Sequence, residues 1–166
     1  MDDIIANHSL YIDQEFEGFI NNFCSTTGAD FPQGRLGNYL GSWYEGYLYC
    51  LLIGLNTNSR NYLGYTKNKK HQKMSVWSPK NINQYKYCIA RVMAREDINT
   101  ELKLNSRDNI QNNFISTENL LSKVRDICEQ FSLGGVHYLK QLYDNDPSIF
   151  DDQLALKTIY ENSIPK

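Results

Sequence analysis

The residues in this sequence with the clearest chemical potential are cations. The segment 58–73, NSRNYLGYTKNKKHQK, holds five Lys or Arg residues, one His and two Tyr, and no acidic residue. Cationic side chains neutralise phosphates, and aromatic rings between them can stack on unpaired bases. The alternatives are an acidic protein surface as the partner, solvent-exposed lysines with no partner, and pairing with acidic residues of the same chain.

The segment belongs to a longer basic block. Residues 46–95 contain nine Lys or Arg and no Asp or Glu, whereas residues 1–45 carry a net charge of −6 and residues 96–166 a net charge of −5. Acidic flanks would keep the rest of the surface away from a polyanion and so orient docking. The candidate nucleic-acid or partner-binding residues are Arg60, Tyr62, Tyr65, Lys67, Lys69, Lys70, Lys73, Trp77, Lys80, Lys86, Arg91 and Arg95.

Two histidines are the candidates for acid–base chemistry. His71 lies in the basic segment, where neighbouring cations disfavour its protonation. His137 follows Gly134 and Gly135, where a side chain can be held near a helix start. The sequence shows no nucleophile motif, no phosphate-binding glycine loop and no zinc-finger or helix-turn-helix pattern. We therefore predict no catalytic residue, no metal site and no cofactor, and keep an enzyme with a site near His137 or His71 as an alternative.

The four cysteines are Cys24, Cys50, Cys88 and Cys128, and none of them forms a CxxC pair. Zinc ligands usually come in close pairs, so the spacing argues against a metal site. Each cysteine lies among apolar neighbours, and we expect buried free thiols that pack as small hydrophobic side chains.

The chain has no segment expected to enter a membrane. Its longest apolar run, residues 47–55, is far shorter than the roughly 20 residues of a membrane-spanning helix. The acidic N-terminus lacks the basic and apolar regions of a secretory signal. We expect a cytoplasmic protein, with nucleic acid or an acidic protein as the partner.

Apolar residues at helical intervals predict the elements that carry these groups. Helices are expected over residues 10–25, 36–55, 81–97 and 117–133, with two shorter helices after Gly134 and Gly135 end the fourth. Asp146 and Pro147 are a favourable start for the last helix. Residues 61–66 and 73–77 favour strands and could pair as a small hairpin, near 62–77, across residues 67–72. Residues 98–116 should form an irregular connection.

Helix 36–55 is the most apolar segment and the predicted central helix. It contains Gly37, Gly41, Gly46 and Gly54, although each glycine costs about 1 kcal/mol relative to Ala inside a helix. Close approach of another backbone would explain them, either within the chain or from a partner in an oligomer or complex. The predicted core comprises Phe16, Phe19, Phe23, Trp43, Leu48, Leu51, Ile89, Val92, Leu121, Val124, Ile127 and Phe131.

Together these patterns predict a single, mainly α domain of about five or six helices. The leading functional hypothesis is a non-enzymatic accessory or adaptor protein that contacts the phosphate backbone of a nucleic acid through residues 60–95. The alternatives are a protein-interaction subunit whose basic block docks on an acidic partner, and the small enzyme described above.

Overall fold

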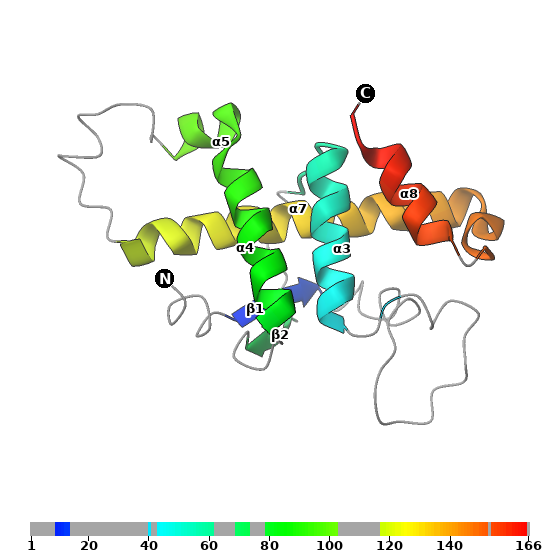
Figure 1. Cartoon of the computed structure of the whole chain (residues 1–166), viewed down its shortest axis with the longest axis horizontal. Helices are drawn as coiled ribbons and strands as arrows, with labels where there is room; N and C mark the ends of the chain where they lie inside the picture. Colours follow the sequence, from blue (N-terminus) through cyan, green and yellow to red (C-terminus); the bar gives the residue numbers. More distant parts are fainter. Residues whose placement is uncertain are drawn as a thin grey trace.

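The computed structural model describes residues 9–13, 40, 43–61, 69–73, 79–102, 117–152 and 154–165. Figure 1 shows the helices and strands that these residues form. In chain order they are β1 (Ser9–Asp13), α3 (Trp43–Asn56), β2 (Lys69–Lys73), α4 (Pro79–Met93), α5 (Glu96–Glu101), α7 (Thr117–Asn145), the 3-10 helix η2 (Pro147–Phe150) and α8 (Ala155–Ser163). The predicted mainly α fold class is confirmed. None of the described helices is both long and apolar enough to cross a membrane.

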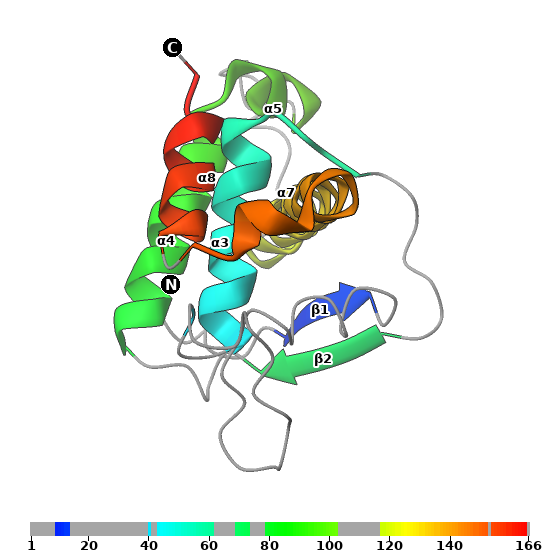
Figure 2. The same cartoon turned by 90° about the vertical axis from the view of Figure 1, so that its right-hand side faces the viewer.

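The longest helix, α7, has 29 residues and supports a layer of three other helices. Figure 1 shows α4, α3 and α8 crossing α7, and Figure 2, viewed nearly along α7, shows all three on one side of it. The middle helix of this layer is α3, as the sequence predicted. Two hydrogen bonds fix α8 to it: Tyr49 Oη donates to the Leu156 carbonyl at 2.7 Å, and Asn56 Nδ2 donates to Ser163 Oγ at 3.0 Å.

The predicted end of the long helix at Gly134 and Gly135 is wrong, because α7 continues through both glycines. Their role is in packing. A Cβ atom on Gly135 would lie 1.9 Å from the carbonyl oxygen of Cys50, and one on Gly54 would lie 1.9 Å from the carbonyl oxygen of Phe131. The backbones of α3 and α7 therefore touch directly where the helices cross, and no side chain fits between them.

This contact confirms at Gly54 the close backbone approach predicted for the glycines of helix 36–55. The approaching backbone belongs to the same chain, so Gly54 needs no partner protein to explain it. Gly46 is buried within α3. Gly37 and Gly41 lie outside the described residues.

The two strands pair in an antiparallel sheet whose register runs from Ser9 opposite Lys73 to Asp13 opposite Lys69. The predicted turn of the hairpin is wrong at residues 69–72, which form a strand with Lys73 and pair with residues 9–13. Residues 62–66 and 74–77 of the two predicted hairpin strands lie outside the described residues. The helix expected from residue 10 is also wrong over this stretch. Polar and apolar residues alternate in SLYID, as they do in a strand with one buried face, and Tyr and Ile favour strands. The same apolar residues also fit a helical spacing, which is why a helix was predicted. Residues 14–25 lie outside the described part of the chain.

The core lies between α7 and the layer of three helices. Six predicted core residues are buried: Leu48, Leu51, Val92, Val124, Ile127 and Phe131. Ile89 packs against this core half-buried, and Leu121 is also of intermediate exposure. The remaining predicted core side chains, those of Phe16, Phe19, Phe23 and Trp43, lie outside the described part.

The prediction of buried free thiols is confirmed for Cys50, Cys88 and Cys128. Burial raises the pKa of the Cys88 thiol to about 12, so this sulfur stays protonated and chemically quiet at neutral pH. Across the described residues, no cluster of three or more His, Cys, Asp or Glu side chains could hold a metal ion.

The glycine contact yields a stability prediction. Gly135→Ala places a methyl group against the Cys50 carbonyl and should destabilise the protein by about 3 kcal/mol or more, because two packed backbones cannot move apart cheaply. In a solvent-exposed helix the same change would stabilise the protein by about 1 kcal/mol. The direction of the stability change therefore tests whether the two backbones are in contact. Urea unfolding followed by circular dichroism measures the difference.

Asn83→Ala, on the exposed side of α4, is the control and should leave the stability unchanged or slightly raised. A Gly135→Ala protein as stable as the unmodified chain would contradict the close contact.

Candidate functional site

The turn that follows α3 carries the first cation of the basic block. Asn58 has a φ of 52°, a left-handed conformation that Asn tolerates better than most residues. The Ser59 N–H then reaches back to the Gly54 carbonyl at 2.9 Å, which ends the helix in a Schellman-type cap. The chain next passes over α7, where a Cβ atom on Gly134 would lie 2.0 Å from the Ser59 carbonyl oxygen. Glycine on α7 thus allows the turn to lie directly on the helix.

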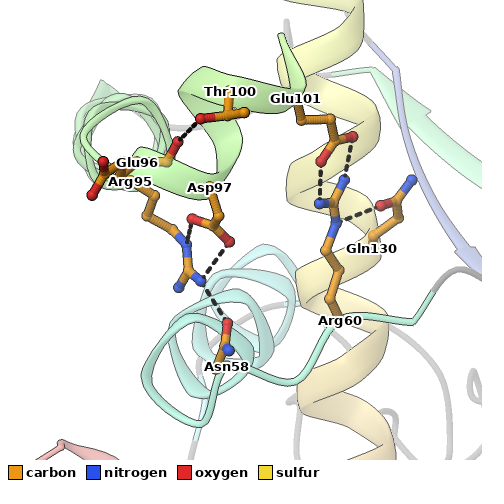
Figure 3. Close-up of polar contacts among 8 residues, drawn as sticks. All are labelled: Asn58, Arg60, Arg95, Glu96, Asp97, Thr100, Glu101 and Gln130. Carbon is orange, nitrogen blue, oxygen red and sulfur yellow. Dashed lines mark hydrogen bonds and ion pairs between the residues drawn. The ribbon is translucent and has the colours of Figure 1, made fainter.

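Arg60 is held inside this turn by a carboxylate and an amide. Its Nη1 and Nη2 atoms donate to the two carboxylate oxygens of Glu101 at 2.5 and 2.9 Å, and Nε donates to Gln130 Oε1 at 2.7 Å (Figure 3). The Arg60 side chain is only 9% exposed, whereas that of Glu101 is 46% exposed. The hydrogen bond from Arg60 is the main reason that the pKa of Glu101 lies below its ordinary value. Arg60 therefore ties the turn to both α5 and α7.

Arg95 makes a second bridge, between the start of α5 and the same turn. Its Nη2 donates to Asn58 Oδ1 at 2.6 Å, and Nε and Nη2 donate to the Asp97 carboxylate at 3.0 and 2.9 Å (Figure 3). These bonds lower the pKa of Asp97. The buried ring of Phe131 also lies 5.1 Å from the guanidinium carbon of Arg95 and 5.7 Å from that of Arg60, within the range of cation–π attraction.

Arg91 connects three helices through one amide. Its Nη2 donates to Asn56 Oδ1 at 2.9 Å, and Asn56 in turn donates to Ser163 on α8. Asn56 is buried, so both ends of its amide side chain gain partners that water cannot supply there. The chain from α4 through α3 to α8 is thereby held by polar contacts as well as by apolar packing.

The three arginines of the basic block, Arg60, Arg91 and Arg95, contact groups of their own chain. Lys69, Lys70 and Lys73 lie on β2, while Lys80 and Lys86 lie on α4. Tyr62, Tyr65, Lys67 and Trp77 lie outside the described residues, so their part in binding stays a prediction. The sequence did not point to the partners Asn58, Glu101 and Gln130, because they lie 37, 41 and 70 residues from the arginines they bind. Asp97, two residues after Arg95, was not predicted either, although its spacing is local.

A polar pocket of about 490 Å³ opens beside Arg60. One wall is the turn 58–61, and the other is α7, through Gly134, His137, Tyr138 and Gln141. The structure thus places His137, one of the two candidate bases, next to amide, hydroxyl and guanidinium groups. The other candidate, His71, lies on β2, so the two histidines come from different elements.

A second pocket, of about 440 Å³, lies between α3 and α4 and has a more apolar lining. Leu48, Leu52 and Tyr49 contribute to it from α3, and Tyr87, whose residue surface is 62% exposed, from α4. The Tyr49 hydroxyl is already bound to the Leu156 carbonyl. This surface suits an apolar contact rather than a polyanion.

A closed group of polar side chains lies where α3, α4 and α7 meet. The ring centroids of Tyr47 and Tyr85 are 6.4 Å apart. Burial, above all, raises the pKa of both tyrosines well above the ordinary value. The carboxylate of Glu129, 4% exposed, also lies here, with Arg125 Nε at 3.9 Å. Because the tyrosines stay neutral and are closed to solvent, they serve packing rather than proton transfer.

The Arg60–Glu101 pair predicts a pH dependence. The pKa of Glu101 is lowered in the folded protein, so its contribution exists above the ordinary Glu pKa of about 4.3 and is lost as the pH falls through the folded value. Glu101→Gln should reduce the free energy of unfolding at neutral pH and have a smaller effect below about pH 4. The Glu101 side chain is nearly half exposed, so we expect a loss of about 1 kcal/mol or less.

Glu96→Gln, on the same short helix, is the control and should show no such pH-dependent difference. Thermal unfolding measured across the acid range compares the two variants. An equal response of both would show that the pair with Arg60 does not contribute.

Comparisons with known proteins give no family for this chain. No protein-family model matches it, and neither curated proteins nor solved structures contain a match.

Proposed function

We propose that the protein is a non-enzymatic accessory protein that binds the phosphate backbone of nucleic acids through the lysines around β2. One observation carries this proposal: three cations of the basic block, Lys69, Lys70 and Lys73, lie within the five residues of β2. We assign binding to this concentration of positive charge on one strand.

The dimensions of β2 suit an extended polyanion. A five-residue strand spans about 17 Å, and three of the five residues of β2 are lysines. Regularly spaced phosphates along a nucleic-acid strand can meet several such cations at once, and each neutralised phosphate releases counterions. Lys67, two residues before β2, would extend the same segment.

The position of β2 in the fold also supports the proposal. It pairs with β1 along one edge, and no other described strand pairs with it. Figure 2 shows this sheet beside the helical body rather than within its layer of helices. A cation-rich strand at the periphery can approach a large polyanion without rearrangement of the core.

The experiment replaces Lys69, Lys70 and Lys73 with Gln and measures binding of labelled single- and double-stranded DNA and RNA at low salt. If the three lysines contact phosphates, the log–log salt slope of binding should fall in magnitude by about 2 to 3. We expect the melting temperature to stay nearly constant, and a large fall would show instead that these lysines pair with acidic residues of their own chain.

The matched control is Lys123→Gln, Lys140→Gln and Lys157→Gln, which removes the same charge from α7 and α8. Loss of binding confined to the β2 variant supports the proposal. Equal losses in both variants would show that binding depends on net charge alone and not on β2. If no polynucleotide binds at low salt, the proposal is refuted.

The alternative partner, an acidic protein surface, gives the same salt dependence and needs a separate test. An unlabelled polynucleotide should displace a labelled nucleic acid from the protein at stoichiometric concentrations. Association with an acidic protein that polynucleotides do not displace would favour the alternative.

A further inference from the structure

The register of the two strands sorts the residues of β2 by face. Successive residues of a strand lie on opposite faces of a sheet, and residues opposite each other in an antiparallel pair share a face. Lys69, His71 and Lys73 therefore lie on one face of the sheet. Lys70 and Gln72 lie on the other face. The three lysines of the proposed binding strand are thus not equivalent.

The residues of β1 make the two faces chemically different. Its aliphatic residues, Leu10 and Ile12, share the face of Lys70. Antiparallel sheets commonly pack an apolar face on the core and leave a polar face to solvent, and β1 contacts α7. We therefore expect the face with Leu10 and Ile12 to pack toward the helices. The opposite face, called the Tyr11 face below, comprises the cross-strand pairs Ser9–Lys73, Tyr11–His71 and Asp13–Lys69.

The Tyr11 face combines aromatic residues with cations. Tyr11 and His71 form its central pair, and Lys69 and Lys73 lie on either side of this pair. The two lysines are four residues apart, which is about 13 Å along a strand. A single nucleic-acid strand presents phosphates along its backbone and the faces of its unpaired bases, so it can bind both lysines and stack a base on the tyrosine. In a duplex the bases are paired and stacked on one another, which leaves no base face for the ring.

The carboxylate of Asp13 makes the charge of the Tyr11 face uneven. Asp13 is opposite Lys69, whereas Lys73 is opposite the neutral Ser9. Opposite charges directly across a sheet attract each other, and a carboxylate repels a phosphate. The attraction for a polyanion is therefore greater at the Lys73 end of the face.

We infer that the Tyr11 face binds single-stranded nucleic acid in preference to duplex, with a base stacked on Tyr11 and phosphates bound by Lys69 and Lys73. The inference rests on the nucleic-acid binding proposed above, and it adds the form of the ligand and the residue that selects it. Lys70, on the other face, contributes less to binding.

The test compares a labelled oligothymidylate of about 10 nucleotides, a length within the range of single-strand sites, with a GC-rich duplex of the same length at low salt. The full chain should bind the single strand more tightly. Tyr11→Val removes the ring but keeps a residue that favours strands. It should weaken single-strand binding about tenfold, the loss of one stacked base, and leave duplex binding unchanged. Tyr11→Phe keeps the ring and should bind as tightly as the unmodified chain.

Single charge variants test the assignment of faces. Lys73→Gln should weaken binding more than Lys70→Gln, although both remove one charge from the same strand. Asp13→Asn should strengthen binding, because it removes the carboxylate opposite Lys69. The control for a lost ring is Tyr87→Ala: Tyr87 lies on α4, is 62% exposed, and should not affect binding.

Three results would overturn the inference while nucleic-acid binding at β2 remains. They are duplex binding as tight as single-strand binding, equal effects of Tyr11→Val and Tyr87→Ala, and equal losses in Lys73→Gln and Lys70→Gln. If Tyr11→Val fails to fold, the comparison of duplex with single strand and that of the two lysine variants decide. Absence of binding to either probe would refute the proposed function, and this inference with it.

Discussion

The contact between Gly54 and Gly135 brings two helix backbones together with no side chain between them, and the rest of the described fold is positioned by it. It sets where α3 crosses α7, and hence where α4 and α8 lie on either side of α3. The turn after α3 leaves from the same crossing and rests on Gly134. Both arginine bridges and the polar pocket begin in that turn, so their geometry follows from the approach of the two helices.

The use of arginine for the contacts between helices has a physical basis. A planar guanidinium can bind both oxygens of a carboxylate and also lie against an aromatic ring, as Arg60 does with Glu101 and Phe131. An ammonium group is more strongly hydrated and is harder to bury. Counting charges treats the two residues alike, but in this fold arginines join α3, α4, α5 and α7, while three lysines lie on β2.

The sequence predicted what depends on local spacing and missed what depends on contacts between distant residues. Apolar periodicity located α3, α4 and α7 and six of their buried residues, because each helix buries one continuous face. It failed at Gly134 and Gly135, because glycines usually end a helix but here allow contact with backbone far away in the sequence. It also failed at residues 9–13, whose strand partner lies about 60 residues away. The partners of Arg60 were missed for the same reason: Glu101 is 41 residues from Arg60 and Gln130 is 70. The lysines of the candidate site were evident from composition, whereas the polar pocket required the turn and α7 to be seen together.

The reciprocal arrangement of the two glycines has a consequence for the uniqueness of the fold. Each glycine faces the carbonyl of the residue four positions before the other glycine, Cys50 on α3 and Phe131 on α7. If α3 slid along α7 by one helical turn, Cys50 or Leu51 would bring a side chain against a backbone that leaves no room for a methyl group. Apolar helix faces by themselves tolerate several alignments of similar energy, but this pair of helices has one register that fits. A contact that contributes no side-chain burial of its own thus selects the native alignment over its nearest competitors.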